Sequence, residues 1–144
     1  MIYVTDISGY DRSMFEDDER NVLKESMELF HEVCNCRWLQ RTRMVLCLNK
    51  SDLFRHKICT QGKSLKLCFP DYDGRDGDYD HALEFVRQQF LSGVREKKRG
   101  RSNNYHICTP VTCMIDRENV KKVWNDLQHV IVFSALSRQW SFDF

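Results

Sequence analysis

The residues with the clearest chemical potential follow an apolar run, Val45–Leu48, and are Asn49, Lys50 and Asp52. In an open parallel sheet, ligands bind just beyond the carboxyl ends of the strands. Asp52 can accept hydrogen bonds from adjacent ring N–H and amino donors, an edge that guanine offers and adenine does not. Asn49 can donate to ring N7 or O6, and the stem of Lys50 can lie over the ring face. The string favours a guanine site; a polar turn capping a helix from Leu53 remains the alternative.

A second stretch with binding potential is Thr112–Asp116, between the last predicted strand and the last predicted helix. We expect it at the same end of the sheet as Asn49. A backbone N–H near a helix N-terminus can point at an electronegative ligand atom such as guanine O6. The two stretches together predict one site at the carboxyl edge of a sheet.

The elements that must position these residues are predicted from apolar periodicity and turn residues. In chain order they are a strand at 2–5, a helix from about Met14 to Arg37, a strand at 44–48, a short helix at 53–58, a long loop at 59–79, a helix from Tyr79 to about Arg95, a strand at 105–109 and a helix from Asp116. This alternation predicts an α/β fold with a parallel sheet and helices on both faces.

Four local features carry predictions of their own. The acidic run Glu16–Glu19 is expected in the first helical turns, where it favours the positive end of the helix dipole. Pro110 cannot donate to a ladder, so its strand is expected to be an edge or to end there. Asp116 is a good helix N-cap. The last helix is expected to pack on the sheet through an apolar stripe, namely Val120, Val123, Trp124, Leu127 and Ile131.

Composition describes an ordinary soluble domain. The chain has 144 residues, 42% of them hydrophobic, and a net charge of +1 that creates no field to recruit nucleic acid. No apolar stretch reaches the roughly 18 residues of a spanning helix, and the start lacks signal-peptide character. The seven cysteines are scattered without zinc-site spacing, which favours reduced thiols, mostly in the core, in a cytosolic protein.

Several longer strings resemble one family. They are Lys24–Phe30, Cys36–Leu39, Leu48–Ile58, Cys68–Gly74 and Asp116–Val120. Together with the Asn-Lys-x-Asp and Cys113-Met114 strings, they resemble the alpha subunit of heterotrimeric G proteins, from Ile2 to about Val132.

The resemblance implies a P-loop NTPase fold of the Ras-like type, of which residues 1–144 would be only the carboxyl-terminal, guanine-recognition half. The family's phosphate loop, helical domain and switch regions precede this part, and no Gly-x-x-x-x-Gly-Lys-Ser/Thr string occurs in the chain. The family uses GTP or GDP with Mg²⁺, whose ligands are absent here. We therefore expect no catalytic and no metal-binding residue in this chain, and no GTP hydrolysis by it alone.

Carried over by resemblance, Asn49, Lys50 and Asp52 match the guanine readers. Cys113 and Met114 match the family's Cys-Ala pair, with the Met114 N–H as the donor to O6. A backbone donor survives a change of side chain, although the longer thioether chain can crowd the base.

Other positions match contact regions of the family. Glu25 lies where the family has a glutamate that holds an arginine of the second switch, and Trp38 matches a surface aromatic near effector contacts. Trp38 is either tucked under the fold or displayed to a partner. The basic turn 96–101 matches a receptor-facing region, whereas Trp140 stands where the family has Gly, and this puts receptor coupling in question. Asp6 is a further departure, because a carboxylate buried at this strand end needs a partner.

The expected partners are therefore a G-protein beta-gamma dimer, a G-protein-coupled receptor and an effector. The full-length protein would lie at the inner face of the plasma membrane and contact it only peripherally, with no nucleic-acid partner. Two further interpretations stay open: a non-catalytic module that competes for receptor or effector, and a decayed sequence that does not fold stably.

Overall fold

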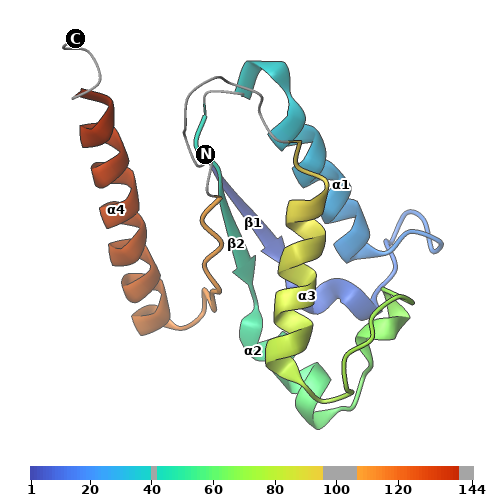
Figure 1. Ribbon diagram of the computed structural model, residues 1–144. Helices are drawn as coiled ribbons and strands as arrows, with labels where there is room; N and C mark the ends of the chain where they lie inside the picture. The colour runs from blue at the N-terminus through green and yellow to red at the C-terminus, as the bar shows by residue number, and fades with distance from the viewer. Residues whose placement is uncertain (40–41, 96–106, 140–144) are drawn as a thin grey trace.

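The computed structural model describes residues 1–39, 42–95 and 107–139, with side chains through residue 128 (Figure 1). Its elements are β1 (Ile2–Asp6), η1 (Ile7–Asp11), α1 (Val22–Asn35), η2 (Arg37–Leu39), β2 (Val45–Asn49), α2 (Ser51–Arg55), η3 (His56–Thr60), η4 (Leu65–Leu67), α3 (Tyr79–Ser92) and α4 (Arg117–Gln139). Three of the short helices, η1, η2 and η4, are 3-10 helices, and η3 is a π-helix.

The sheet is parallel, as predicted. β1 and β2 pair with Ile2 opposite Val45 and Asp6 opposite Asn49. Residues 107–112 run along the other side of β2, bridged to it in parallel at two points. The first four residues of β2 are all buried, which is typical of a central strand covered on both faces.

The third strand extends further than the predicted span of 105–109. N–H groups of β2 donate to the carbonyl oxygens of Cys108 and Pro110 at 2.8 and 2.9 Å, and the Thr112 N–H donates to the Leu48 carbonyl at 2.8 Å. Pro110 has no N–H to complete the ladder between these bonds. The pairing is therefore interrupted at Pro110 but does not end there, because the carbonyl of Pro110 still accepts.

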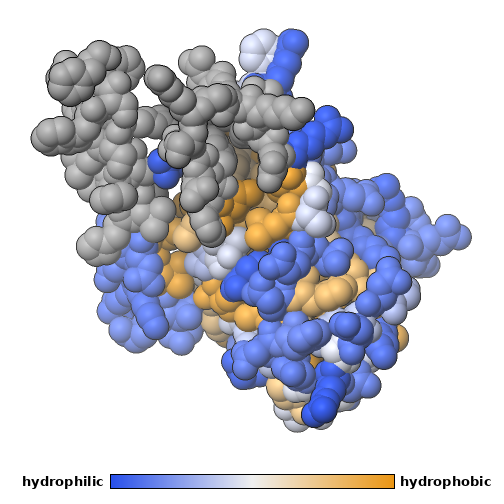
Figure 2. Space-filling model, in the orientation of Figure 1, coloured by the Kyte–Doolittle hydropathy of each residue, from blue (hydrophilic) through white to orange (hydrophobic). Residues whose placement is uncertain are grey.

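Helices cover both faces of the sheet (Figure 1). Leu46 and Leu48 of β2 point into a large core formed with α1 and α3, which includes fully buried Phe30 and Phe90. Val45 and Cys47 point to the opposite face, where they meet α4. Figure 2 shows apolar surface in the middle of the visible face, between α3 and α4.

α1 begins later than the predicted Met14. The Asn21 side chain accepts hydrogen bonds from the N–H groups of Leu23 and Lys24 and so caps the helix at this point. Phe15 consequently lies outside the helix and is fully exposed. The helical periodicity that included Phe15 was coincidental.

The acidic run Glu16–Glu19 is therefore not in the first turns of a helix, and the predicted dipole compensation is wrong for it. A backbone bond of 2.7 Å from the Met14 N–H to the Arg20 carbonyl closes this stretch into a loop. The only acidic residue in the first turn of α1 is Glu25.

The segment 59–79 is more ordered than the predicted long loop. It contains η4, and the side chains of Leu65, Cys68, Phe69 and Tyr72 are buried in the main core. The Gly and Asp residues of this segment indicated a loop, and the sequence analysis therefore did not identify these four residues as core residues. The segment is thus part of the core rather than a surface connection.

The middle helices agree with prediction. α3 begins at Tyr79 as expected, capped by the Asp78 side chain, and its buried residues include Val86 and Phe90. α2 starts slightly earlier than predicted, at Ser51, and this places Asp52 in its first turn.

α4 is capped by Asp116 as predicted, because the Asp116 carboxylate accepts from the N–H groups of Glu118 and Asn119 at 3.0 and 3.3 Å. Within residues 1–39, 42–95 and 107–139, no helix combines the length and apolar character that crossing a membrane requires.

The predicted apolar stripe of α4 is only partly correct. Leu127 is buried and Val123 packs beside it against the sheet. Trp124 is 51% exposed and Val120 is 40% exposed, so the prediction that both are core residues is wrong. Of the stripe residues whose side chains are described, only Val123 and Leu127 pack against the strands. The side chain of Ile131 lies outside the described residues.

Cys36, Cys47, Cys59, Cys68, Cys108 and Cys113 are free thiols. Cys34, Cys47 and Cys68 are buried, as predicted for core thiols, whereas Cys59 is exposed. Burial raises the pKa of the Cys68 thiol to about 11. This thiol is therefore protonated and unreactive at neutral pH.

Candidate ligand site at the carboxyl edge of the sheet

The carboxyl ends of β1, β2 and the 107–112 segment meet at one edge of the sheet. Asp6 ends β1 opposite Asn49 in the parallel register. The Ser51 N–H donates to the Thr112 carbonyl at 3.2 Å, which joins the start of α2 to the end of the third strand. The two stretches singled out in the sequence thus lie at the same end of the sheet, as predicted, and are in direct contact.

Asn49 connects these stretches through its side chain. Its Oδ1 accepts from the Thr112 hydroxyl at 3.2 Å and from the Met114 N–H at 3.1 Å. The Met114 N–H therefore points from the Cys113-Met114 turn toward Asn49. The Met114 side chain is half-exposed.

Lys50 adopts a left-handed backbone conformation, with φ 61° and ψ 40°, at the N-cap of α2. Residues with a Cβ seldom adopt it, so the surrounding contacts must hold it in place. The Lys50 ammonium contacts the Asp6 carboxylate, with 2.9 Å between Nζ and Oδ2. The expected need of Asp6 for a partner is confirmed.

Asp52 lies beside Cys113. Partial burial and the neighbouring Asp52 carboxylate, which accepts a hydrogen bond from the thiol, raise the pKa of Cys113. Asp52 itself is exposed in the first turn of α2. Asn49 and Asp52 thus both contact the 112–114 stretch, whereas Lys50 contacts the end of β1.

Asn119 is a site residue that the sequence interpretation missed. Its Oδ1 accepts from the Cys113 N–H at 2.9 Å. The start of α4 therefore holds the backbone of the Cys113-Met114 turn. A polar side chain three residues after the Asp116 cap was the available signal, because such side chains commonly reach back over a helix N-terminus.

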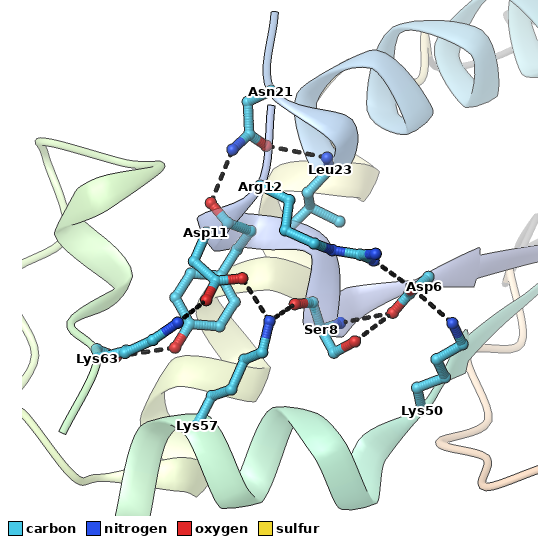
Figure 3. A network of polar contacts seen from close by, with 10 residues as sticks. Asp6, Ser8, Asp11, Arg12, Asn21, Leu23, Lys50, Lys57 and Lys63 are labelled. Atoms are coloured by element: carbon cyan, nitrogen blue, oxygen red, sulfur yellow. Dashed lines mark hydrogen bonds and ion pairs between the residues drawn. The ribbon is translucent and has the colours of Figure 1, made fainter. Parts of the chain in front are cut away.

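A second charged cluster lies at the other end of η1 (Figure 3). The nearly buried Asp11 carboxylate contacts the ammonium groups of Lys57 and Lys63. Burial opposes its ionisation, but these two cations hold the pKa of Asp11 below its ordinary value. Lys57 also donates to the Ser8 carbonyl at 2.8 Å. The cluster fastens η1 to η3 and the chain that follows it.

Glu25 lies in the first turn of α1 and Trp38 lies in η2. Glu25 contacts Arg20 at 2.6 Å, a partner that the sequence interpretation did not identify. Trp38 is 77% exposed and stacks against the Arg37 guanidinium, 4.3 Å from the ring centroid. Of its two predicted placements, the displayed one is correct. η2 lies at the opposite end of the sheet from α2 (Figure 1).

The groups at the carboxyl edge suit binding of a polar planar ligand. The groups come from the end of β1, from residues 49–52 and from the Cys113-Met114 turn. They are the carboxylates of Asp6 and Asp52, the Asn49 amide, the Lys50 ammonium group and the Met114 N–H. Among the described residues, no cluster of His, Cys, Asp or Glu has the arrangement of a metal site. The basic turn 96–101 and Trp140 lie outside the described residues.

This arrangement defines a class, the α/β proteins that bind ligands beyond the carboxyl ends of parallel strands. A family model described as G-protein alpha subunit matches residues 1–131. The chain is 35% identical over 132 residues to the guanine nucleotide-binding protein G(o) subunit alpha of Geodia cydonium, and 35% identical over 136 residues to that of Caenorhabditis elegans. The chain belongs to the G-protein alpha subunit family.

The alignments cover 92% and 94% of the chain but only 35% and 36% of the two relatives. The chain thus spans about a third of the length of the curated relatives it matches.

Proposed function

We propose that the carboxyl edge of the sheet recognises the guanine base of GTP or GDP. The observation that carries the proposal is the direct contact between Asn49 and the Met114 N–H, which joins the two predicted base-reading stretches. Family membership supports the same ligand, because the two relatives are named guanine nucleotide-binding proteins.

In this proposal each group has a distinct role. Asp52 accepts from the ring N–H and the amino group of guanine, and Asn49 donates to N7 or O6. The Met114 N–H donates to O6, with Cys113 beside it in the same turn. In the structure this N–H donates to Asn49 Oδ1, so a bound base would share or replace that bond.

For the whole protein we propose a GTP/GDP switch in receptor signalling, with GTP hydrolysis and Mg²⁺ as the family resemblance implies. Residues 1–144 would be the guanine-recognition half of its Ras-like, P-loop NTPase domain. Its partners would be a beta-gamma dimer, a G-protein-coupled receptor and an effector at the inner face of the plasma membrane. Glu25 would contact the second switch only by releasing Arg20, to which it is bound here.

A second candidate function is a non-catalytic module that competes for an effector. The exposure of Trp38 favours it, because a tryptophan that is 77% exposed offers a large contact surface. Loss of effector binding in Trp38→Ala, with guanine binding unchanged, would assign this activity to η2. Guanine binding by the same chain would show that the two functions coexist.

The proposed base recognition is tested by titrating the chain with GDP and following backbone amide shifts by NMR. The family resemblance implies that the phosphate and magnesium contacts come from residues outside this chain, so we expect a dissociation constant weaker than about 1 μM. Shifts should concentrate at residues 49–52 and 112–114. A Kd below this value, or shifts located elsewhere, would contradict the proposal.

Asp52→Asn should reverse base preference from guanine toward xanthine. Xanthine carries a carbonyl where guanine has its amino group, so an amide can donate where the carboxylate accepted. The loss for GDP should be about 1.5–3 kcal/mol, the range for hydrogen bonds to charged groups. Competition between GDP and XDP measures it, and an unchanged preference means that Asp52 does not contact the base.

A further inference from the structure

Asp6 has two carboxylate oxygens with separate tasks (Figure 3). Oδ1 accepts from the Ser8 N–H at 2.9 Å and from the Ser8 hydroxyl at 2.6 Å, and these bonds cap η1. Oδ2 accepts from Lys50 Nζ at 2.9 Å and from Arg12 Nη2 at 2.7 Å. Because Ser8 fixes Oδ1, the position of Oδ2 is fixed as well.

The charge of Asp6 is stabilised in this position. Burial opposes ionisation, but the hydrogen bonds from Ser8 and the ammonium group of Lys50 hold the pKa of Asp6 below its ordinary value. The carboxylate is therefore an anion at neutral pH, fastened to the strand end that lies opposite Asn49.

The Asp6 carboxylate holds the side chain of Lys50 through an ion pair. Among the described residues, Lys50 alone combines a side chain with a positive φ. The left-handed turn directs its side chain back toward β1, and the Asp6 contact retains it there. The Lys50 side chain is nevertheless 47% exposed, so its stem remains accessible to a ligand.

We infer that Asp6 is a positioning residue that holds Lys50 along the face on which the guanine base is bound. The inference rests on the proposed function. A free lysine side chain loses much of its rotamer freedom when a ligand orders it. Asp6 restricts that freedom before the base arrives, so less is lost on binding.

Asp6→Asn separates the two tasks of the carboxylate. Asparagine retains an oxygen for the Ser8 bonds and is itself a good helix cap. Its amide NH₂ donates where Oδ2 accepted, so the bonds to Lys50 and Arg12 are lost. Guanosine monophosphate affinity, measured by NMR titration of the full chain, should fall about threefold to tenfold.

A double-mutant cycle with Lys50→Met identifies the route of this effect. Methionine retains an apolar stem without the ammonium group. If Asp6 acts through Lys50, Asp6→Asn should leave the affinity unchanged in the Lys50→Met background. An equal loss in both backgrounds would mean a merely structural role and would overturn the inference, as would an unchanged affinity in Asp6→Asn alone.

Arg12→Gln is the matched control, because it removes the other cation from Oδ2 and leaves Lys50 in place. Its affinity should equal that of the unaltered chain, and a loss as large as that of Asp6→Asn would overturn the specific role of Lys50. If the unaltered chain shows no shifts with guanosine monophosphate, the proposed function fails and this inference fails with it. If the chain binds guanosine monophosphate but the effects of Asp6→Asn and Lys50→Met are additive, this inference fails and the proposed function stands.

The ion pair can also be measured without nucleotide. Reductive methylation of Lys50, followed by mass spectrometry, should be several-fold faster in Asp6→Asn. Lys57 and Lys63, which contact Asp11 instead, should react at unchanged rates. Equal Lys50 rates in the two proteins would overturn the inference.

Discussion

The two faces of the sheet are packed very differently. On the face of α1 and α3, aromatic side chains interlock: Phe30 contacts Phe90 and Tyr3 in edge-on geometry, with ring centroids 5.6 and 5.2 Å apart. On the face of α4, the described core consists of Val45, Cys47 and Leu127, with Cys108 and Val123 partly buried beside them.

The difference extends to β1. Tyr3 and Thr5 point toward α1, where both hydroxyls contact Ser26. Ile2 and Val4 point to the other face and remain 46% and 47% exposed. The first face therefore supplies most of the stability of this chain, whereas the second positions the Cys113-Met114 turn through the start of α4.

The largest loss of stability is expected for Phe90→Ala, on the face of α1 and α3. Phe90 is fully buried between α1 and α3, so its loss should cost about 3–5 kcal/mol of unfolding free energy. Urea denaturation followed by circular dichroism measures the change. Gln88→Ala, at an exposed position of the same helix, should shift stability by no more than about 0.5 kcal/mol.

Leu127→Ala tests the thinner face. Leu127 is a buried residue of α4 in that core, and its neighbours include the partly buried side chains of Cys108 and Val123, which can close over a cavity. The cost should be about 2–3 kcal/mol, near the lower end for buried leucine. A cost equal to that of Phe90→Ala would show that the two faces are equally well packed.

Asp11→Asn tests the charged cluster that fastens η1 beneath the larger core. Replacing the charge should cost about 1.5–3 kcal/mol at neutral pH. The pKa of Asp11 is lowered from 3.8 in the folded chain, so its contribution is complete above that value and disappears as the pH falls through the folded pKa.

Unfolding free energies of wild type and Asp11→Asn should therefore differ by a constant amount near neutral pH and converge below 3.8. Asp18→Asn, in the exposed acidic loop, is the matched control and should remain close to wild type throughout. A difference between wild type and Asp11→Asn that persists unchanged into acid would show that the charge is not responsible.

Trp124→Ala should have the smallest effect. The sequence pattern predicts a core residue, whose loss costs about 3–5 kcal/mol, but the side chain is 51% exposed. We therefore expect less than about 1 kcal/mol, in the range of surface substitutions. A thermal midpoint lowered as far as that of Leu127→Ala would mean that α4 buries Trp124 in solution.

Much of the fold follows from local patterns. The apolar run of β2 is continuous because both of its faces are covered, and its abrupt polar end marks the site. α3 and the Asp116 cap were predictable for the same reason: periodicity and capping depend on residues close in sequence. The Cys113-Met114 turn followed from its place between a strand and a helix.

The start of α1 shows the limit of periodicity. Phe15 continues the helical spacing. The helix nevertheless begins at Val22, because the Asn21 side chain accepts hydrogen bonds from the N–H groups of Leu23 and Lys24. The segment 59–79 shows the opposite error, because turn residues concealed buried Leu65 and Phe69. In the first case a local cap outweighed the periodicity, and in the second contacts with the main core outweighed the turn residues.

The sequence by itself determined the class of fold and the chemical types at the site, since both depend on the order of apolar and polar residues. Only the tertiary structure decided the partners: Lys50 with Asp6, Glu25 with Arg20 and Met114 with Asn49. Two of these pairs join residues more than forty positions apart. Parallel pairing of β1 with β2 and of β2 with the third strand brings such residues to one edge, and no local pattern encodes that register.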